Sequence, residues 1–448
     1  MIHQNIPRQT GTVALAELVA AFSYALDLTE GQPAGHCIRS CWIGMHVGQA
    51  LGLSRQQLDD LYFTILLKDL GCSSNAARIC ELYEADDRAF KQGYKMVGTS
   101  LAATLHFVVS RTARGASLRR RSAAIGNILR NGGAIAQELI VSRCTRGSEI
   151  ARSLRFSEAV CEGIYRLDEH WDGSGRPGRL REHAIPLFSR IALLSQVVDV
   201  FHSHAGRQAA LDEVRRRSRA WFDPELVTAF ERVAQADSFW STLASPFVES
   251  RVVRLAPDES RRVDEDYLDD IAAAFGQVID AKSPFTAGHS ERVGTLALQM
   301  GEQLGVAPER RRWLRRAALL HDIGKLGVSS TILEKPAGLD ENEWRDMRDH
   351  AVHTRAILGR VGALSDMADI AAAHHERLDG RGYPLGLKAG QIARETRIIT
   401  VCDFYDALTA DRPYRAALPR PEALRIMGDE VGRAVDGACF EALRATVC

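Results

Sequence analysis

The stretch LLHDIGK, residues 319–325, places a histidine, an aspartate and a lysine at the end of an apolar helical run. More histidines and aspartates surround it in the C-terminal part of the chain. Imidazole and carboxylate groups together suit Zn, Fe, Mn, Ni or Co, and the absence of cysteine from the set disfavours a structural zinc site. The candidate residues are His289, His321, Asp322, His350, His374, His375 and Asp403.

The adjacent pair His374–His375 indicates more than one metal ion. Neighbouring helical residues project about 100° apart, so the two imidazoles suit different ions or different sides of one cluster. Asp322 has two oxygens and can bridge two ions, which together clamp an attacking hydroxide and a phosphoryl oxygen. A lone histidine is more often an ordinary surface or core residue, as we expect for His353. Paired histidines in a helix core are unfavourable unless each has a partner, so the set favours a dinuclear centre.

The segments that carry these residues have a helical pattern. In RRRWLRRAALLHDIGK, residues 310–325, Trp313, Leu314 and Ala317 recur at three- and four-residue spacing, with arginines on the other face. Alternating segments rich in valine and isoleucine are scarce. We predict an all-α protein.

The chain also repeats itself. Residues 34–72 align without a gap with residues 287–325, which places His36 opposite His289 and Asp69 opposite Asp322 at an offset of 253. Farther on, EHWDGSGRP (169–177) resembles ERLDGRGYP (376–384) at an offset of 207, so the first copy holds 46 extra residues between 73 and 167. We predict two tandem helical domains, at 10–245 and 265–448, with a linker at 246–264.

Composition excludes several classes of function. The 448 residues have a formal net charge of zero, so the whole-chain field attracts neither a nucleic acid polymer nor an anionic membrane. No apolar run reaches the roughly 18 residues of a membrane span, and the N-terminus does not resemble a signal peptide. Nine cysteines without CxxC spacing argue against a disulfide framework. We expect a cytoplasmic protein.

Five motifs of the second copy, including TAGHSERV, HDIGKLGV, HHERLDGRGYP and VCDFYDALTADRPYR, resemble the diagnostic motifs of the HD-GYP family of metal-dependent phosphohydrolases. The resemblance covers about 265–448. It implies a bacterial signalling enzyme that hydrolyses cyclic di-GMP to linear pGpG or onward to GMP with two divalent metal ions, for which we expect Fe or Mn.

The resemblance also assigns roles. It implies that Asp322 bridges the metals and that Lys325 supplies a positive charge beside the scissile phosphate. Arginines donate two hydrogen bonds to phosphate. Some relatives carry a glutamate ligand for a third metal where this chain has Phe285, so we predict two metals. The implied metal ligands are His289, His321, Asp322, His350, His374, His375 and Asp403, and the implied nucleotide-side residues are Tyr383, Asp406, Arg412 and Arg415.

The first copy keeps His36 and Asp69 but loses the other ligands. A lysine in a metal cage brings a cation where a cation should bind, so we expect this copy to be degenerate and to hold no dinuclear site. No histidine lies between His46 and His106, so we expect the His350 equivalent to be absent. The replacements are Lys68 for His321, Cys72 for Lys325, Leu167 and Asp168 for His374 and His375, Gln196 for Asp403 and Arg176 for Tyr383.

Alternatives stay open for both copies. The first copy could serve as an internal pseudo-dimer partner, bind a regulatory ligand or bind a protein. The second could hydrolyse another cyclic or linear nucleotide, or the chain could be a non-catalytic signalling scaffold that binds a cyclic dinucleotide. A homodimer or a signalling protein partner is compatible with each alternative.

Overall fold

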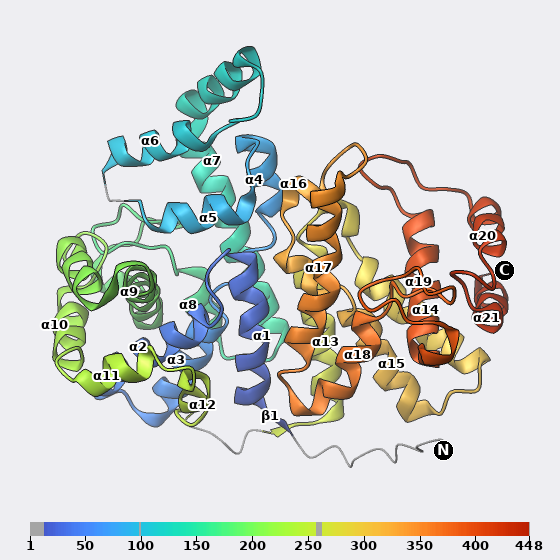
Figure 1. Ribbon diagram of the computed structural model, residues 1–448. Coiled ribbons are helices and arrows are strands. Elements are labelled where there is room, and N and C mark those ends of the chain that lie inside the picture. The colour runs from blue at the N-terminus through green and yellow to red at the C-terminus, as the bar shows by residue number, and fades with distance from the viewer. Residues whose placement is uncertain (1–12, 98–99, 257–261, 448) are drawn as a thin grey trace.

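The computed structural model describes residues 13–97, 100–256 and 262–447. The described residues form helices and one two-stranded antiparallel sheet, in which β1 (Val13–Ala14) pairs with β2 (Arg262–Val263). Two helical bodies lie side by side in Figure 1, the first coloured blue to green and the second yellow to red. The prediction of an all-α protein with two tandem copies is confirmed.

The first copy contains twelve of the described helices. Several begin at side chains that accept a hydrogen bond from the first turn, such as Ser54 and Ser117. The helices are α1 (Leu15–Thr29), α2 (His36–Ala50), α3 (Arg55–Leu66), α4 (Ala76–Tyr83), α5 (Asp87–Lys95), α6 (Leu101–Arg111), α7 (Leu118–Ser153), α8 (Glu158–Tyr165), α9 (Leu187–Arg217), α10 (Pro224–Val233), α11 (Asp237–Leu243) and α12 (Val248–Val253).

The second copy follows the same plan with fewer elements. Asp340 and Glu343 form a capping box at the start of α17, and Pro308 occupies the first turn of α15. The helices are α13 (Glu265–Asp280), α14 (His289–Gln303), α15 (Pro308–Leu320), α16 (Ser330–Leu333), α17 (Glu341–Leu358), α18 (Ser365–Ala372), α19 (Arg394–Thr409), α20 (Arg420–Asp429) and α21 (Gly437–Val447), and a 3-10 helix spans Ile323–Gly327.

The two copies pack against each other in a pseudo-symmetric way. Phe22 of α1 and Phe275 of α13 stand at the 253-residue offset, and their rings stack with centroids 4.1 Å apart. Helix α1 packs against α17 and against the 3-10 helix Ile323–Gly327 of the second copy, while α13 packs against α7 of the first. One apolar core continues through both copies. The first copy is therefore an integral packing partner of the second.

The extra residues of the first copy form α5, α6 and the outer part of α7, whereas α4 stands opposite α16 at the 253-residue offset. Helix α6 and the outer part of α7 project at the top of Figure 1. These helices and α4 share a small apolar cluster, which includes Tyr83, Phe90 and Ile128. The predicted linker 246–264 contains α12 and β2, while residues 257–261 and the first residues of the predicted first domain lie outside the described residues. The exact domain boundaries stay a prediction.

A buried ion pair joins the extra segment to the second copy. The Lys282 Nζ atom lies 2.7 Å from Asp87 Oδ2, and the Ser330 backbone N–H donates to Asp87 Oδ1 at 2.9 Å. All three residues are buried. Ser330 lies five positions after Lys325, so the first copy holds the segment that directly follows the HDIGK motif.

Replacing Asp87 tests this junction. In Asp87→Ala the Lys282 ammonium stays buried without its partner, and we expect a loss of about 3–5 kcal/mol in the free energy of unfolding, measured by chemical denaturation. The control is Glu81→Ala, because Glu81 pairs with Arg78 at the surface and is 69% exposed. That change should lower the stability by less than about 1 kcal/mol. Equal effects of the two substitutions would contradict the account.

Candidate metal centre

Four histidines from different segments point into one buried space. His289 begins α14, His321 follows α15, His350 lies in α17 and His374 follows α18. The outward Nδ1 atom of each ring has a hydrogen-bond partner, so in a neutral ring the proton lies on Nδ1 and the inward Nε2 atom is able to bind a metal. The acceptors are Asp406 Oδ2 for His289 (2.6 Å), Ala318 O for His321 (2.6 Å), Met347 O for His350 (2.5 Å) and Ala371 O for His374 (2.6 Å).

Asp322 lies between these histidines. Its Oδ2 atom is 3.5 Å from His289 Nε2 and 3.3 Å from His321 Nε2. Its Oδ1 atom is 3.6 Å from both His350 Nε2 and His374 Nε2. On the side of His289 and His321, Asp403 Oδ1 lies 3.5 Å from His289 Nε2. Each oxygen of the Asp322 carboxylate thus faces its own pair of histidine Nε2 atoms.

These atoms fit divalent metal ions. The four Nε2 atoms and Asp322 Oδ1 are buried and have no hydrogen-bond partner among the residues that the structure describes. A buried polar atom left in this state costs about 1–3 kcal/mol, and several of them converging on one point make a cation the natural partner. His375 belongs to the same donor cluster as Asp322, His350 and His374. The site therefore has nitrogen and oxygen donors on both sides of one carboxylate.

The protonation states of His350, His375 and Asp322 suit metal binding. Burial lowers the pKa of His289, but the carboxylates of Asp322, Asp406 and Asp403 outweigh it and raise this pKa to about 9, so His289 releases a proton when a metal binds. Burial lowers the pKa of His350 to about 3 and lowers that of His375 well below its ordinary value, so both imidazoles are neutral near pH 7. Burial alone would raise the pKa of Asp322, but Lys325 and His321 hold it well below its ordinary value. Neutral imidazole and ionised carboxylate are the forms that bind a metal.

The HDIGK turn brings Lys325 to the centre. The Lys325 Nζ atom lies 2.5 Å from Asp322 Oδ2. A Cβ atom at Gly324 would collide with the carbonyl oxygen of His350, so the turn requires glycine there. Tyr383 lies on the His350 side, and its ring centroid is 4.7 Å from that of His375. Lys325 and Tyr383 therefore border the cluster.

The other predicted nucleotide-side residues have contacts of their own. Asp406 accepts from His289 Nδ1, and its other oxygen accepts from Arg292 Nε at 2.5 Å. It therefore orients a candidate ligand. The Arg415 guanidinium donates to the carbonyl oxygens of Ala407, Leu408 and Ala416 at 2.7–2.9 Å and holds the end of α19. Arg412 pairs with Arg415 through the backbone.

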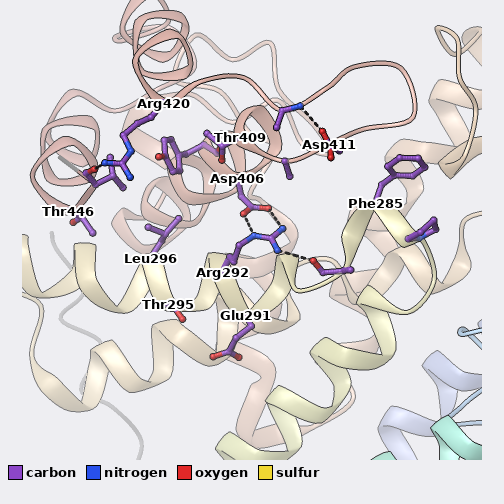
Figure 2. A pocket seen from close by; sticks show the side chains of 16 residues that line it. Phe285, Glu291, Arg292, Thr295, Leu296, Asp406, Thr409, Asp411, Arg420 and Thr446 are labelled. Carbon is purple, nitrogen blue, oxygen red and sulfur yellow. Dashed lines mark hydrogen bonds and ion pairs between the residues drawn. The ribbon is translucent and has the colours of Figure 1, made fainter.

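A cavity of about 970 Å³ lies beside the centre, between α14, the end of α19 and α21. Figure 2 shows Arg292 and Asp406 paired in its wall, Phe285 at one side and Arg420 at the other. Asp406 connects the two regions, because it lines the cavity and also holds His289. The seven candidate metal ligands do not line the cavity.

The first copy keeps the scaffold of this centre. His36 Nδ1 lies 2.7 Å from Asp199 Oδ2, and Arg39 Nε donates to Asp199 at 2.6 Å, as His289 and Arg292 do with Asp406. Gly71 lies against the carbonyl oxygen of Arg143 just as Gly324 lies against that of His350. Arg143 therefore stands in the position of His350, and the extra residues of the first copy lie between 73 and 142.

Side-chain cations fill the first copy's site. Lys68 forms a buried ion pair with Asp69, and Arg143 pairs with Asp168. Lys95 of the extra segment lies 2.8 Å from Glu30. Glu30, Asp69 and Cys72 lie close enough together to hold a metal, but lysines already neutralise the two carboxylates. The charge that a metal would bring is supplied by the chain itself.

Two of these assignments escaped sequence reasoning, although the sequence held a signal for both. The 207-residue offset places Arg143 opposite His350, beyond the stretch between His46 and His106 that lacks histidine. The pairing of His289 with Asp406 was visible as a repeated His–Asp combination, since His36 and Asp199 recur in the first copy.

Comparison with known proteins agrees with this fold. The profile of the HD domain family matches residues 123–226 and 274–439. The chain therefore belongs to the HD domain family, and the resemblance to its HD-GYP branch is confirmed.

Its relatives are bacterial phosphodiesterases. The chain is 53% identical to 3'3'-cGAMP-specific phosphodiesterase 3 of Vibrio cholerae over 97% of this chain and 94% of the relative. It is 37% identical to a cyclic di-GMP phosphodiesterase of Thermotoga maritima over 36% of this chain and 44% of that one. A crystal structure of a cyclic GMP-AMP specific phosphodiesterase of V. cholerae superimposes with a TM-score of 0.67 at 47% identity and covers 98% of each chain.

Among the described residues, none of the helices combines the length and the apolar character needed to cross a bilayer.

The contact between Asp406 and His289 predicts a metal-binding effect. Asp406→Ala removes the acceptor that orients His289, and we expect the affinity for Mn²⁺ to fall about 10- to 100-fold in a calorimetric titration. Asp199→Ala is the matched control, because Asp199 makes the same contact in the first copy. A similar loss in both variants would contradict the assignment of the site to the second copy.

The Glu30–Lys95 pair predicts a pH effect on stability. Burial raises the pKa of Glu30, but Lys95 and Lys91 oppose this and bring it from 4.5 to about 2. The carboxylate therefore stabilises the fold by about 3 kcal/mol above pH 4.5, and this contribution declines as the pH falls toward 2. We expect Glu30→Gln to be less stable than the wild type at pH 7, with a gap that narrows between pH 4.5 and 3 in chemical denaturation. A gap of constant size would contradict the pairing.

Proposed function

We propose that the chain is a metal-dependent phosphodiesterase that hydrolyses 3'3'-linked cyclic dinucleotides in bacterial signalling. The observation that carries the proposal is the buried Asp322 carboxylate. Each of its oxygens faces two histidine Nε2 atoms, and these nitrogen atoms have no hydrogen-bond partner among the described residues. The activities for which its relatives are named support the substrate class.

Two metal ions fit the donor set. His289, His321 and Asp403 would hold one ion, His350, His374 and His375 the other, and Asp322 would contact both. Nitrogen and oxygen donors suit Fe or Mn. When bound, the metals supply Lewis acidity and a hydroxide near neutral pH. Phe285 offers no donor atom, so we do not expect a third ion.

The chain's own residues supply orientation and charge. Asp406 and three backbone carbonyls fix the imidazole rings. Lys325 offsets the charge that develops on the scissile phosphate, and Tyr383 borders the substrate. Arg412 stays a candidate for the nucleotide side. Because the Arg415 guanidinium is engaged with three carbonyl groups, we assign to it the positioning of the loop that carries Arg412.

We expect 3'3'-cyclic GMP–AMP to be the preferred substrate and cyclic di-GMP, which the motifs suggested first, to be the second candidate. The relative that is 53% identical over nearly the whole chain is specific for 3'3'-cGAMP, whereas the T. maritima cyclic di-GMP enzyme matches only 36% of it. The two dinucleotides differ in one purine base, so the same phosphoester chemistry serves both.

Turnover of the Mn-loaded protein tests the proposal. The wild type should convert cyclic GMP–AMP to a linear dinucleotide, separated by chromatography, faster than it converts cyclic di-GMP. Lys325→Ala should lower kcat about 100- to 1000-fold, because it removes a preorganised charge. The control is Cys72→Ala at the corresponding position of the first copy, which should keep the wild-type rate. Intact dinucleotides after incubation with the metal-loaded wild type would favour a binding scaffold.

A further inference from the structure

An aromatic and cationic surface lies beside the candidate metal centre on α17. Trp344 and Arg348 stand four residues apart, so they share one face of the helix, and His350 follows two positions later. The Arg348 guanidinium carbon lies 5.7 Å from the centroid of the Trp344 ring and 5.6 Å from that of Tyr383. The cation is therefore held between two aromatic rings.

This surface is continuous with the candidate ligands. The Tyr383 ring lies 4.7 Å from His375 and 6.1 Å from His350, centroid to centroid. Going outward, the order is His375, Tyr383, Arg348 and Trp344. These side chains therefore connect the candidate ligands with the exposed Trp344.

The side chains of Arg348 and Trp344 have surfaces that are available to a ligand. Within the described residues, Arg348 forms neither an ion pair nor a hydrogen bond, whereas Lys325 pairs with Asp322 and Lys335 with Glu343. Trp344 is 44% exposed, so packing in the core does not explain why a large aromatic residue stands at this position. A free guanidinium offers paired donors to phosphate, and an exposed indole offers a face on which a base can stack.

The first copy lacks this surface as well as the metal ligands. The offset that relates His350 to Arg143 places Gln137 opposite Trp344, Val141 opposite Arg348 and Arg176 opposite Tyr383. The Gln137 side chain donates to the carbonyl oxygen of Pro177 at 2.9 Å and thus has a structural contact. Stacking surface and ligand set are therefore present together in one copy and absent together from the other.

We propose that Trp344 and Arg348 form a nucleotide subsite that rests on the proposed phosphodiesterase function. Trp344 stacks on one purine base of the cyclic dinucleotide, and Arg348 donates to a phosphate oxygen of the same ligand. Tyr383 holds the guanidinium in place from the side of the metal centre. The subsite sets affinity and base preference, while the metal centre carries out hydrolysis.

The test is a kinetic comparison of Mn-loaded variants on cyclic GMP–AMP and cyclic di-GMP. Trp344→Ala should raise KM about tenfold or more, since loss of stacking on a base has an effect of this size. Trp344→Phe keeps a ring and should stay within about threefold of the wild type. Arg348→Lys keeps the charge but loses the fork of donors, so its KM should lie between those of the wild type and Arg348→Ala.

Arg345→Ala is the matched control, because Arg345 is an exposed arginine on the same helix outside this stack. Metal content and melting temperature, measured on every variant, separate a binding defect from a folding defect. If the wild type turns over the dinucleotides and the Trp344 and Arg348 variants match Arg345→Ala, the subsite is wrong and the proposed function stands. If the wild type neither binds nor hydrolyses either dinucleotide, both proposals fail.

Discussion

The buried Asp322 carboxylate, with two imidazole nitrogens facing each of its oxygens, is the constraint on which the rest of the structure depends. Such a group of donor atoms is unfavourable in a protein interior unless positive charge satisfies it. The Nδ1 atom of each of these four histidines is therefore held in place, one by Asp406 and three by backbone carbonyls of α15, α17 and α18. The helices position these rings, and a glycine lets the HDIGK turn pass against α17.

In the first copy, cationic side chains of the chain supply the positive charge that a metal ion would otherwise bring. Lys68 and Arg143 take the positions of two histidines and pair with Asp69 and Asp168, so positive charge is fixed in the chain. This exchange removes the chemistry but keeps a stable body, which packs through Phe22 on Phe275 and through Asp87 on Lys282. Of the three roles open to a degenerate copy, the structure accounts directly for that of an internal partner, because α1 lies against the HDIGK turn.

The fold and the donor residues could be predicted from the sequence wherever a pattern repeated. Constant offsets of 253 and 207 predicted two helical copies, and the motif spacing led to seven donor residues, which the structure brings to one buried cluster. It was insufficient where function depends on contacts distant in the chain. The role of Asp406 depends on a residue 117 positions away, and that of Arg415 on carbonyl groups at a helix end. Trp344 is exposed, and Arg348 has no ion-pair partner in the described part of the chain. Both are properties of a surface, which sequence periodicity does not reveal.

The most direct test of the central claim is an anomalous diffraction map from crystals grown with Mn²⁺. The account predicts two peaks, one on the His289–His321 side of Asp322 and one on the His350–His374 side, with no peak beside Lys68 in the first copy. A single peak, a peak outside this cluster, or a peak between Glu30 and Asp69 would contradict the assignment of a dinuclear centre to the second copy alone.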